Sequence, residues 1–469
     1  MKTEGLGSTF RLAQYLAGLR FEDIPAPVIE RARCVLLDGL SCLVLGIRGT
    51  VGRDAVKVVK LLGGNPHCTI FGGDFRSSVR NAAYANAMTL YSVGLNDIHK
   101  PSTSHPAGCI VMPTLAVGEW LDRGGANVLA ALVAGYEMNA RVGTAMAPSH
   151  RERGFHTTGT VGAFGATAAV GNLMGLSPDR LANAFGVTGS QAAGLYEFHH
   201  DGSLTMVYHA GRAAQNGVEA CILVEHGLTG PVTVLEGSKG FFRAVSDSYD
   251  LDILTRDLGE RHLIEETSFR LYYGCNSTLA ASAATERLLN DRGIRPEDIR
   301  KIVVRCHPVV ARDNNDATAG TLLAARLSMQ FNLALVLARG HVWTADIYDD
   351  DLRDASIRAL MPRISLVADD GMPRFGASVI AEMADGARVE ETVACPGCDT
   401  SRPSSTRRRS PYLASGAWKR TPAVARRAGS SGEHRWDCRL PSITRRWTAL
   451  RRRRFSQTSA CRSRRRSET

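Results

Sequence analysis

The chain has 469 residues, of which 44% are hydrophobic and 22% are charged. This length and composition favour a folded protein of two or three domains with sizeable cores. The first residues lack the basic and then apolar run of a signal peptide, and no apolar stretch reaches the roughly 18 residues of a membrane span. We therefore do not expect the chain to be a secreted or a membrane protein.

The eleven cysteines are mostly scattered singly along the chain. Without a secretory signal, this pattern favours reduced thiols and a cytoplasmic location. Cys395 and Cys398 form the only CxxC pair. Neither a second pair nor a histidine pair lies at zinc spacing, so no metal site is expected.

The formal net charge of +11 belongs to the last part of the chain. Residues 397–469 contain nineteen Arg, one Lys and four acidic residues, a net charge of +16, so residues 1–396 carry −5. The body of the chain therefore has the mildly acidic balance of an ordinary cytosolic enzyme. The basic charge of the tail says nothing about what the body binds.

Most of residues 8–290 is predicted to be helical. Apolar residues recur at helical spacing, and prolines at early positions mark several helix starts. The predicted helices cover residues 25–47, 79–93, 106–121, 127–146, 158–174, 178–195 and 210–226. Many small residues, such as Gly159 and Gly162, allow these helices to approach closely, and residues 68–71 are a short strand candidate.

The pattern changes near residue 295. A β-branched run predicts a strand over residues 301–307. Further helices are predicted at 322–339 and 351–360, and further strands at 364–368, 378–383 and 388–394. The last two strands form a hairpin through Ala-Asp-Gly-Ala. The sequence therefore predicts a mainly α protein, with a large all-helical domain over residues 1–269 and a smaller α/β lid domain over residues 270–395.

Residues 396–469 form an Arg- and Ser-rich tail in which all periodicity stops. Such a tail is typical of a nucleic-acid-binding arm or of a disordered segment. A GC-rich gene translated in a shifted frame also gives abundant Arg, Ser, Pro and Ala with isolated Trp. The ratio of nineteen Arg to one Lys favours the shifted frame. Nucleic acid is therefore expected to bind at most non-specifically, through this tail.

Residues 94–119 are the most informative stretch for function, because a polar loop there lies between two apolar helices. The loop holds Asp97, His99, Lys100, Ser102, Thr103, Ser104 and His105. Asp97 and His105 can serve as base and acid in removing a proton next to a carboxylate. The structural alternatives are that His105 caps the helix opened by Pro106, and that Asp97 accepts local backbone N–H bonds in a turn.

His156 is a second candidate for catalysis. It is followed by Thr157, Thr158 and Gly159 at a predicted helix start. An imidazole beside the free backbone N–H groups of a helix end suits a carboxylate ligand. The structural alternative is that His156 is a partner in capping the helix.

His209 and Arg212 stand three residues apart in a predicted helix and so share one of its faces. Arg212 can bind a carboxylate in bidentate fashion, or it can form an ion pair with another helix. His199-His200-Asp201 contains metal-ligand residue types. Adjacent residues point to different sides of a helix, so this pattern does not favour a metal.

Together these blocks resemble the MmgE/PrpD family, which includes 2-methylcitrate dehydratase, cis-aconitate decarboxylase and iminodisuccinate epimerase. The matching segments are Asn96-Asp-Ile-His, Ser104-His-Pro-Ala-Gly, Gly154-Phe-His-Thr-Thr-Gly-Thr-Val-Gly, His209-Ala-Gly-Arg-Ala-Ala-Gln-Asn-Gly and Gly227-Leu-Thr-Gly-Pro-Val-Thr-Val-Leu-Glu-Gly. The resemblance covers about residues 8–395, with the segments in the right order.

The resemblance implies a large helical domain with a smaller α/β lid, an active site between them, a homodimer, and no metal or organic cofactor. By position it implies that Asp97 and His105 lie in the site loop and that His156 is the second active-site histidine. The residues expected to bind the substrate are His99, Lys100, Arg212 and Arg270.

The sequence also departs from the family pattern. His99 stands where Thr is common, Met206 lies where Lys is frequent, and Arg270 stands where Lys is often found. Because Met206 cannot hold a carboxylate by charge, these departures suggest an acid different from the tricarboxylates of the family. Family members also continue past residue 395 into further helices, whereas this chain continues into the Arg-rich tail, which again favours the shifted frame.

These observations predict a carbon–oxygen lyase similar to 2-methylcitrate dehydratase, acting on a small di- or tricarboxylate. His105 or Asp97 would take a proton next to a carboxylate, and His156 would protonate the leaving hydroxyl or the developing enolate. An epimerase or decarboxylase of the same family, and an inactive truncated relative, are the alternatives. Dehydration needs an acid for the hydroxyl, whereas epimerisation needs two proton carriers on opposite faces, and the sequence does not choose between them.

Overall fold

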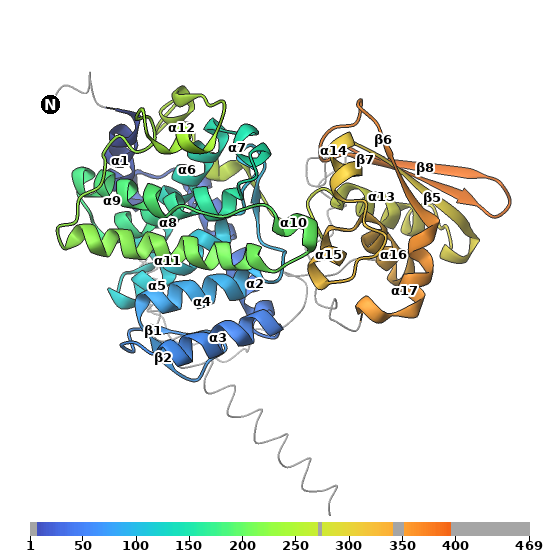
Figure 1. Cartoon of the computed structure of the whole chain (residues 1–469), viewed down its shortest axis with the longest axis horizontal. Helices are drawn as coiled ribbons and strands as arrows, with labels where there is room; N and C mark the ends of the chain where they lie inside the picture. The colour runs from blue at the N-terminus through green and yellow to red at the C-terminus, as the bar shows by residue number, and fades with distance from the viewer. Residues whose placement is uncertain (1–6, 271–273, 341–350, 395–469) are drawn as a thin grey trace, which may run out of the picture.

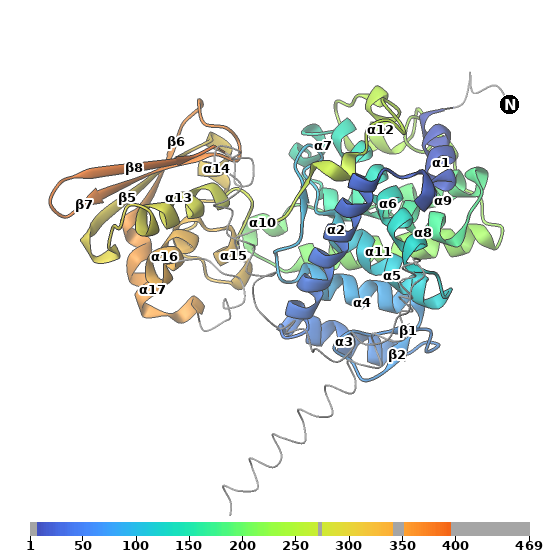
Figure 2. The ribbon, with the colours of Figure 1, turned by 180° about the vertical axis from the view of Figure 1, so that it is seen from behind.

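The structure, a computed structural model, describes residues 7–270, 274–340 and 351–394 (Figure 1). It is mainly helical, with a four-stranded sheet towards the C-terminal end, which confirms the predicted fold class. Figures 1 and 2 show a large helical body beside a smaller body that contains the sheet. The predicted tail, residues 396–469, lies outside the described residues.

The larger body is built from helices α1 to α12. Their bounds are α1 Ser8–Gly18, α2 Ala26–Gly46, α3 Thr50–Leu62, α4 Val79–Tyr91, α5 Pro106–Trp120, α6 Gly125–Ala145, α7 Ser149–Glu152, α8 Thr157–Met174, α9 Pro178–Gln191, α10 Phe198–Asp201, α11 Thr205–Glu225 and α12 Phe241–Val245. Two short antiparallel pairs accompany them, β1 Cys68–Thr69 with β2 Arg76–Ser77 and β3 Ile98–His99 with β4 Thr267–Ser268. The predicted helices are present, with ends displaced by up to five residues.

Small residues allow α6, α8 and α11 to pack closely in the centre of the larger body. A Cβ added to Gly135 of α6 would lie 2.9 Å from the carbonyl oxygen of Gly165 on α8. A Cβ added to Gly217 of α11 would lie 2.5 Å from the Cβ of Ala166 on α8. Real Cβ atoms do not approach other atoms this closely, so glycine is required for this packing. The three helices therefore form a rigid frame.

The smaller body is a sheet covered by helices. Its elements are α13 Leu279–Asn290, β5 Ile299–Cys306, α14 Pro308–Asp313, α15 Leu322–Leu327, α16 Met329–Arg339, α17 Ala355–Leu360, β6 Ile364–Ala368, β7 Ala377–Met383 and β8 Arg388–Val393. The strand order is β6-β5-β7-β8. β5 runs parallel to β6 and antiparallel to β7, and β7 and β8 form the predicted hairpin.

The helix predicted over residues 322–339 is interrupted at Ser328. The backbone of Ser328 is extended (φ −71°, ψ 121°), and its side-chain oxygen accepts a hydrogen bond from the backbone N–H of Phe331 at 3.0 Å. A serine that caps a new helix in this way competes with continuation of the helix before it. The chain therefore forms two helices, and Arg326 lies in the last turn of the first.

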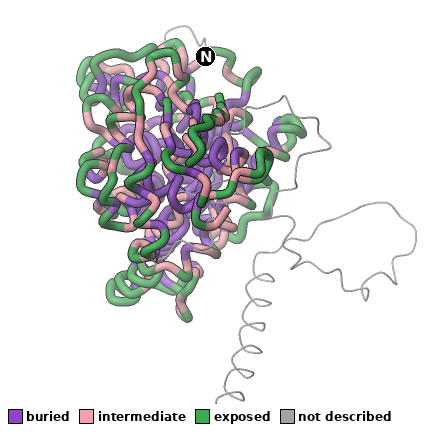
Figure 3. The backbone as a smooth tube through the Cα atoms, turned by 90° about the vertical axis from the view of Figure 1, so that its right-hand side faces the viewer, coloured by how far each residue is buried: buried purple, intermediate pink, exposed green. Residues whose placement is uncertain are grey.

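Each body has its own hydrophobic core. One cluster of buried residues extends from Leu12 to Ile264 in the sequence and the other from Ala280 to Val393. Figure 3 shows buried residues in the interior and exposed residues on the outer loops. Within the described ranges, no single helix has the length and apolar composition of a membrane span, although α2 and α3, which meet at 86°, pass that test as a pair.

Candidate active site

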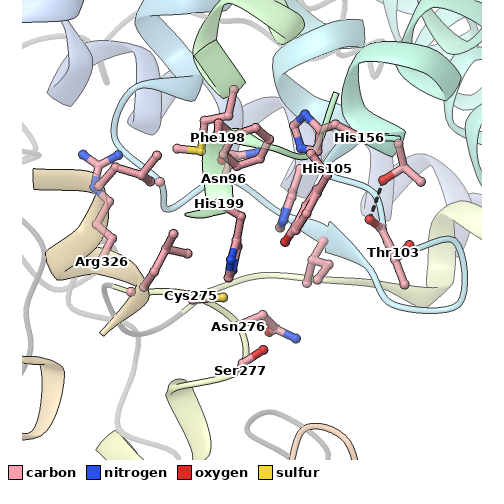
Figure 4. Close-up of a pocket in the computed structure, with 18 of the residues that line it drawn as sticks. Asn96, Thr103, His105, His156, Phe198, His199, Cys275, Asn276, Ser277 and Arg326 are labelled. Atoms are coloured by element: carbon pink, nitrogen blue, oxygen red, sulfur yellow. Dashed lines mark hydrogen bonds between the residues drawn. The ribbon is translucent and has the colours of Figure 1, made fainter. Parts of the chain in front are cut away.

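A cavity lies between the two bodies, and both contribute to it. Its polar and aromatic lining from the larger body includes Tyr91, Asn96, Thr103, His105, Arg151, His156, Tyr196 and His199. The linker and the smaller body contribute Arg270, Cys275, Asn276, Ser277, Arg326 and Phe375. In Figure 4, the two histidines His105 and His156 lie on the side opposite Cys275, Asn276 and Ser277.

The lining of the cavity is rich in positive charge. Three arginines, Arg151, Arg270 and Arg326, line it together with three histidines, and no described lining residue is Asp or Glu. A partly enclosed site with charges of one sign attracts and concentrates ligands of the opposite sign. The cavity is therefore suited to a small molecule with more than one negative charge.

The loop before α5 carries His105 into the cavity. The chain leaves α4 through Gly94, whose φ of +70° lies in the left-handed region that glycine adopts without strain. β3 then pairs with β4, and the His99 backbone N–H donates to the Ser104 carbonyl at 3.0 Å. These bonds fix the loop on both sides of its tip, so the entry of the chain into α5 is held in place.

His105 is the residue before the first turn of α5, and its ring lines the cavity. Nδ1 lies 2.8 Å from the carbonyl oxygen of Asp97, and Nε2 lies 3.0 Å from Nη2 of Arg270. The same Nη2 also lies 3.2 Å from Nδ1, so the position of Arg270 does not distinguish the two ring nitrogens. A carbonyl only accepts, so the bond to Asp97 assigns the tautomer with hydrogen on Nδ1 and a lone pair on Nε2. Burial and the charge of Arg270 lower the pKa of His105 to about 3, so the ring is neutral at pH 7.

Arg270 lies two residues after the end of β4, beside His105. Its Nη1 donates to the carbonyl oxygens of Gly94 at 2.7 Å and Gly274 at 2.9 Å, which connects the active-site loop with the start of the smaller body. Its Nε is buried and has no hydrogen-bond partner among the described residues. Burial lowers the pKa of Arg270, but a guanidinium stays charged at neutral pH. Arg270 can therefore bind a carboxylate in the cavity.

Asp97 lies behind His105 and is not among the described residues that line the cavity. One carboxylate oxygen accepts from the backbone N–H of Ala107 at 3.0 Å, and the other accepts from the Tyr136 hydroxyl at 2.6 Å. Burial raises the pKa of Asp97 to about 6 in spite of these bonds. The contacts match the structural alternative for Asp97, a local acceptor at a helix start, and they hold the carbonyl that orients His105.

A second buried acid, Asp38 of α2, accepts a hydrogen bond from the backbone N–H of Asp97 at 3.2 Å. Burial and the charge of Asp97 raise the pKa of Asp38 to about 8. The unfolded chain loses this proton near pH 4. Between about pH 4 and pH 8 the folded chain therefore holds more protons, and the contribution of Asp38 to folding stability falls as the pH rises through this window.

The variant Asp38→Asn should remove this loss, because asparagine does not titrate. We expect its free energy of unfolding to improve relative to that of the wild type as the pH rises from 5 to 8, by at most about 1.4 kcal/mol per pH unit. Scanning calorimetry at several pH values measures the difference, with the exposed Asp54→Asn as the matched control. A difference that does not change with pH would contradict the raised pKa of Asp38.

His156 precedes the first turn of α8 and lines the cavity, with 6% of its surface exposed. Its Nδ1 lies 2.9 Å from Nδ1 of His209 on α11, and the Phe198 ring packs edge-on against it at 4.9 Å between centroids. Burial and the neighbouring histidines His209 and His105 hold the pKa of His156 well below its usual range. His105 and His156 are therefore neutral imidazoles that can carry protons in the cavity.

Three residues predicted to bind the substrate, His99, Lys100 and Arg212, are not among the described residues that line the cavity. His99 is buried behind the loop, where Nδ1 lies 2.8 Å from the hydroxyl oxygen of Ser102. Lys100 Nζ lies 6.0 Å from the centroid of the Phe375 ring. Arg212 donates to a glutamine one turn further along α11. Of the predicted substrate-binding set, only the arginine after β4 reaches the cavity.

The sequence did not indicate the other two arginines of the cavity. Arg151 in α7 donates from Nη2 to the Tyr196 hydroxyl at 2.6 Å, and its guanidinium carbon lies 4.5 Å from the centroid of that ring. Arg326 in α15 is 8% exposed. His199, considered only as a metal ligand, stacks on Tyr196 at 5.1 Å between centroids. The one available signal was that Arg151 stands shortly before His156 in the chain.

Comparisons with known proteins agree with this architecture. The model of the MmgE/PrpD N-terminal domain matches residues 10–254, and that of the MmgE/PrpD C-terminal domain matches residues 272–408. The chain is 29% identical to the cis-aconitate decarboxylase-like protein oryM of Aspergillus oryzae, over 83% of this chain and 86% of that protein. It is 27% identical to human cis-aconitate decarboxylase (78% of each chain) and 24% identical to 2-methylcitrate dehydratase of Escherichia coli (60% and 62%). The chain belongs to the MmgE/PrpD family.

Proposed function

We propose that this chain is a lyase that acts on a small di- or tricarboxylate in the cavity between its two bodies. The proposal rests on the charge of that cavity, which three arginines line and to which no described residue adds a carboxylate. Each guanidinium can bind one carboxylate through two parallel hydrogen bonds. Three of them therefore match a ligand with two or three carboxylates, and relatives named as decarboxylases and dehydratases support the same class of reaction.

His105 and His156 would carry out the proton transfers. In a dehydration, Nε2 of His105 takes the proton from the carbon next to a carboxylate, and His156 protonates the hydroxyl that leaves as water. In a decarboxylation, the bond to one carboxylate breaks, CO2 leaves, and His156 gives a proton to the carbon that keeps the electron pair. In both reactions Arg270 stabilises the negative charge that develops on the remaining carboxylate.

The relatives favour decarboxylation as the first reaction to test. The human cis-aconitate decarboxylase aligns over 78% of this chain, whereas the 2-methylcitrate dehydratase aligns over 60%. Dehydration, which the sequence predicted, is the second candidate. It is favoured by the presence of His105 and His156 in one cavity, the first with a lone pair on Nε2 to remove a proton and the second to protonate a hydroxyl.

Incubation of the purified full chain with cis-aconitate, citrate and 2-methylcitrate, followed by proton NMR, tests the proposal. We expect at least one of them to be consumed. Decarboxylation releases one CO2 for each molecule consumed, whereas dehydration forms a new alkene without CO2. Melting curves with each compound give a second measurement. No turnover together with no shift in melting temperature would contradict the proposal and favour an inactive relative.

A further inference from the structure

A pair of buried histidines extends from the cavity towards α11. His156 lines the cavity at the start of α8. His209 lies behind it near the start of α11 and is not among the described residues that line the cavity. Their Nδ1 atoms are 2.9 Å apart. Two imidazole nitrogens at this distance share one hydrogen, so one ring donates and the other accepts.

The direction of this hydrogen bond decides what His156 presents to the cavity. If His156 donates, its Nε2 carries a lone pair, and if His209 donates, Nε2 of His156 carries a hydrogen. The His156 side chain has no further hydrogen-bond partner among the described residues, so Nε2 is the nitrogen left for a ligand. An anionic ligand is repelled by a lone pair and attracted by an N–H group. A bound carboxylate therefore selects the arrangement in which His209 donates.

We propose that His209 is a positioning residue that donates its Nδ1 hydrogen to Nδ1 of His156. His156 then presents Nε2–H to the substrate, and His209 supplies a new proton to Nδ1 of His156 when the Nε2 proton leaves. The resupply rests on the proposed lyase function. A neutral imidazole can give up its Nε2 proton only if another proton reaches its Nδ1. His209 is the described side chain placed at hydrogen-bond distance for that purpose.

The proton balance of one transfer is closed. The Nε2 proton of His156 passes to the substrate, the Nδ1 proton of His209 passes to Nδ1 of His156, and a proton from water enters at Nε2 of His209, which is 9% exposed. Each ring exchanges one tautomer for the other, and neither becomes charged. After product release, water protonates Nε2 of His156, the shared proton moves back, and His209 releases a proton to water.

Two substitutions separate the two parts of the proposal. His209→Ala removes both the hydrogen bond and the relay, and we expect kcat to fall about 10²-fold with little change in KM. His209→Asn keeps an N–H group near the position of Nδ1 but cannot relay a proton. We expect it to preserve the tautomer of His156 while kcat stays low. Added imidazole should restore part of the kcat of His209→Ala. The matched control is His262→Asn, a buried histidine (5% exposed) outside the described lining.

Nitrogen-15 NMR of histidine-labelled protein, with citrate as the polyanionic probe, reads the tautomer directly. We expect His156 to carry its hydrogen on Nε2 in the wild type and in His209→Asn, and to lose this preference in His209→Ala. Hydrogen on Nδ1 of His156 in the wild type, or an unchanged kcat in His209→Ala, would overturn the proposal. The spectrum reports on the histidine pair whether or not a tricarboxylate is turned over, so failure of the proposed lyase function remains distinguishable from failure of the relay.

Discussion

Replacing His105 by glutamine should lower kcat by about 10²- to 10⁴-fold and leave the fold in place. The glutamine amide stands near the position of Nε2 and has no lone-pair nitrogen that can take a proton. The hydrogen bond from Nδ1 of His105 to the Asp97 carbonyl, at 2.8 Å, is lost. Loss of one hydrogen bond costs about 1 kcal/mol, or roughly 2–4 °C in melting temperature. Steady-state kinetics and scanning calorimetry measure the two effects separately.

The matched control for this experiment is His226→Gln at the exposed end of α11, which should leave both kcat and the melting temperature unchanged. The proposed role of His105 requires that its variant folds and binds the ligand but turns it over slowly. A variant with the kcat of the wild type would remove His105 from the mechanism. Another side chain of the cavity would then have to transfer the proton.

Replacing Arg270 by methionine should lower kcat/KM by about 10²- to 10³-fold, because a buried charge that binds the substrate is lost. Arg270 also bonds the carbonyl oxygens of Gly94 at 2.7 Å and Gly274 at 2.9 Å, so some stability is lost as well. Arg270→Lys keeps the charge but not the fork of donors, and we expect it to recover only part of the activity. Kinetics of both variants, with their melting temperatures, test this expectation.

The pKa of His105 in Arg270→Met tests the contact between the two side chains separately from stability. A loss of stability alone would not raise this pKa. Burial and the positive charge of Arg270 together lower the pKa of His105 to about 3. Removing that charge should therefore raise the pKa of His105, whereas Arg270→Lys should leave it low. NMR of the His105 ring protons against pH measures the shift. An equal pKa in Arg270→Met and the wild type would contradict the assigned contact between the two side chains.

The sequence predicted the helices well because their signals are local. Small and apolar residues at helical spacing, with Pro106 at the first position of α5, define where a helix begins and how it packs. The break at Ser328 was missed, because serine caps a helix only if the surrounding fold turns the chain there. A hydrophobic period alone continues through such a residue.

The candidate site was predicted in part. His105 and His156, expected from the matching segments, line the cavity together with Arg270, which was expected at a position where the family often has Lys. Ile98 and His99 are successive residues of β3, and Ile98 lines the cavity, so the alternation of a strand turns His99 to the other side. A cluster of ionisable residues in a loop therefore does not show which of them share one face.

The remaining cavity residues could not be predicted, because tertiary packing alone brings them together. Arg151 and Arg326 come from short helices in different bodies, far apart in the sequence. Neither stands in a pattern that differs from an ordinary surface arginine. The positive charge of the cavity, on which the functional proposal rests, became visible only when these side chains were placed beside Arg270.

Titration calorimetry with tricarballylate, a saturated tricarboxylate that cannot be dehydrated, tests the central claim most directly. We expect the wild-type chain to bind it at one site per chain, Arg270→Met to bind it at least 10-fold more weakly, and the uncharged triamide of the same acid not to bind. Binding of the triamide as tightly as the acid, or equal binding of tricarballylate by Arg270→Met and the wild type, would contradict a cavity built to hold carboxylates.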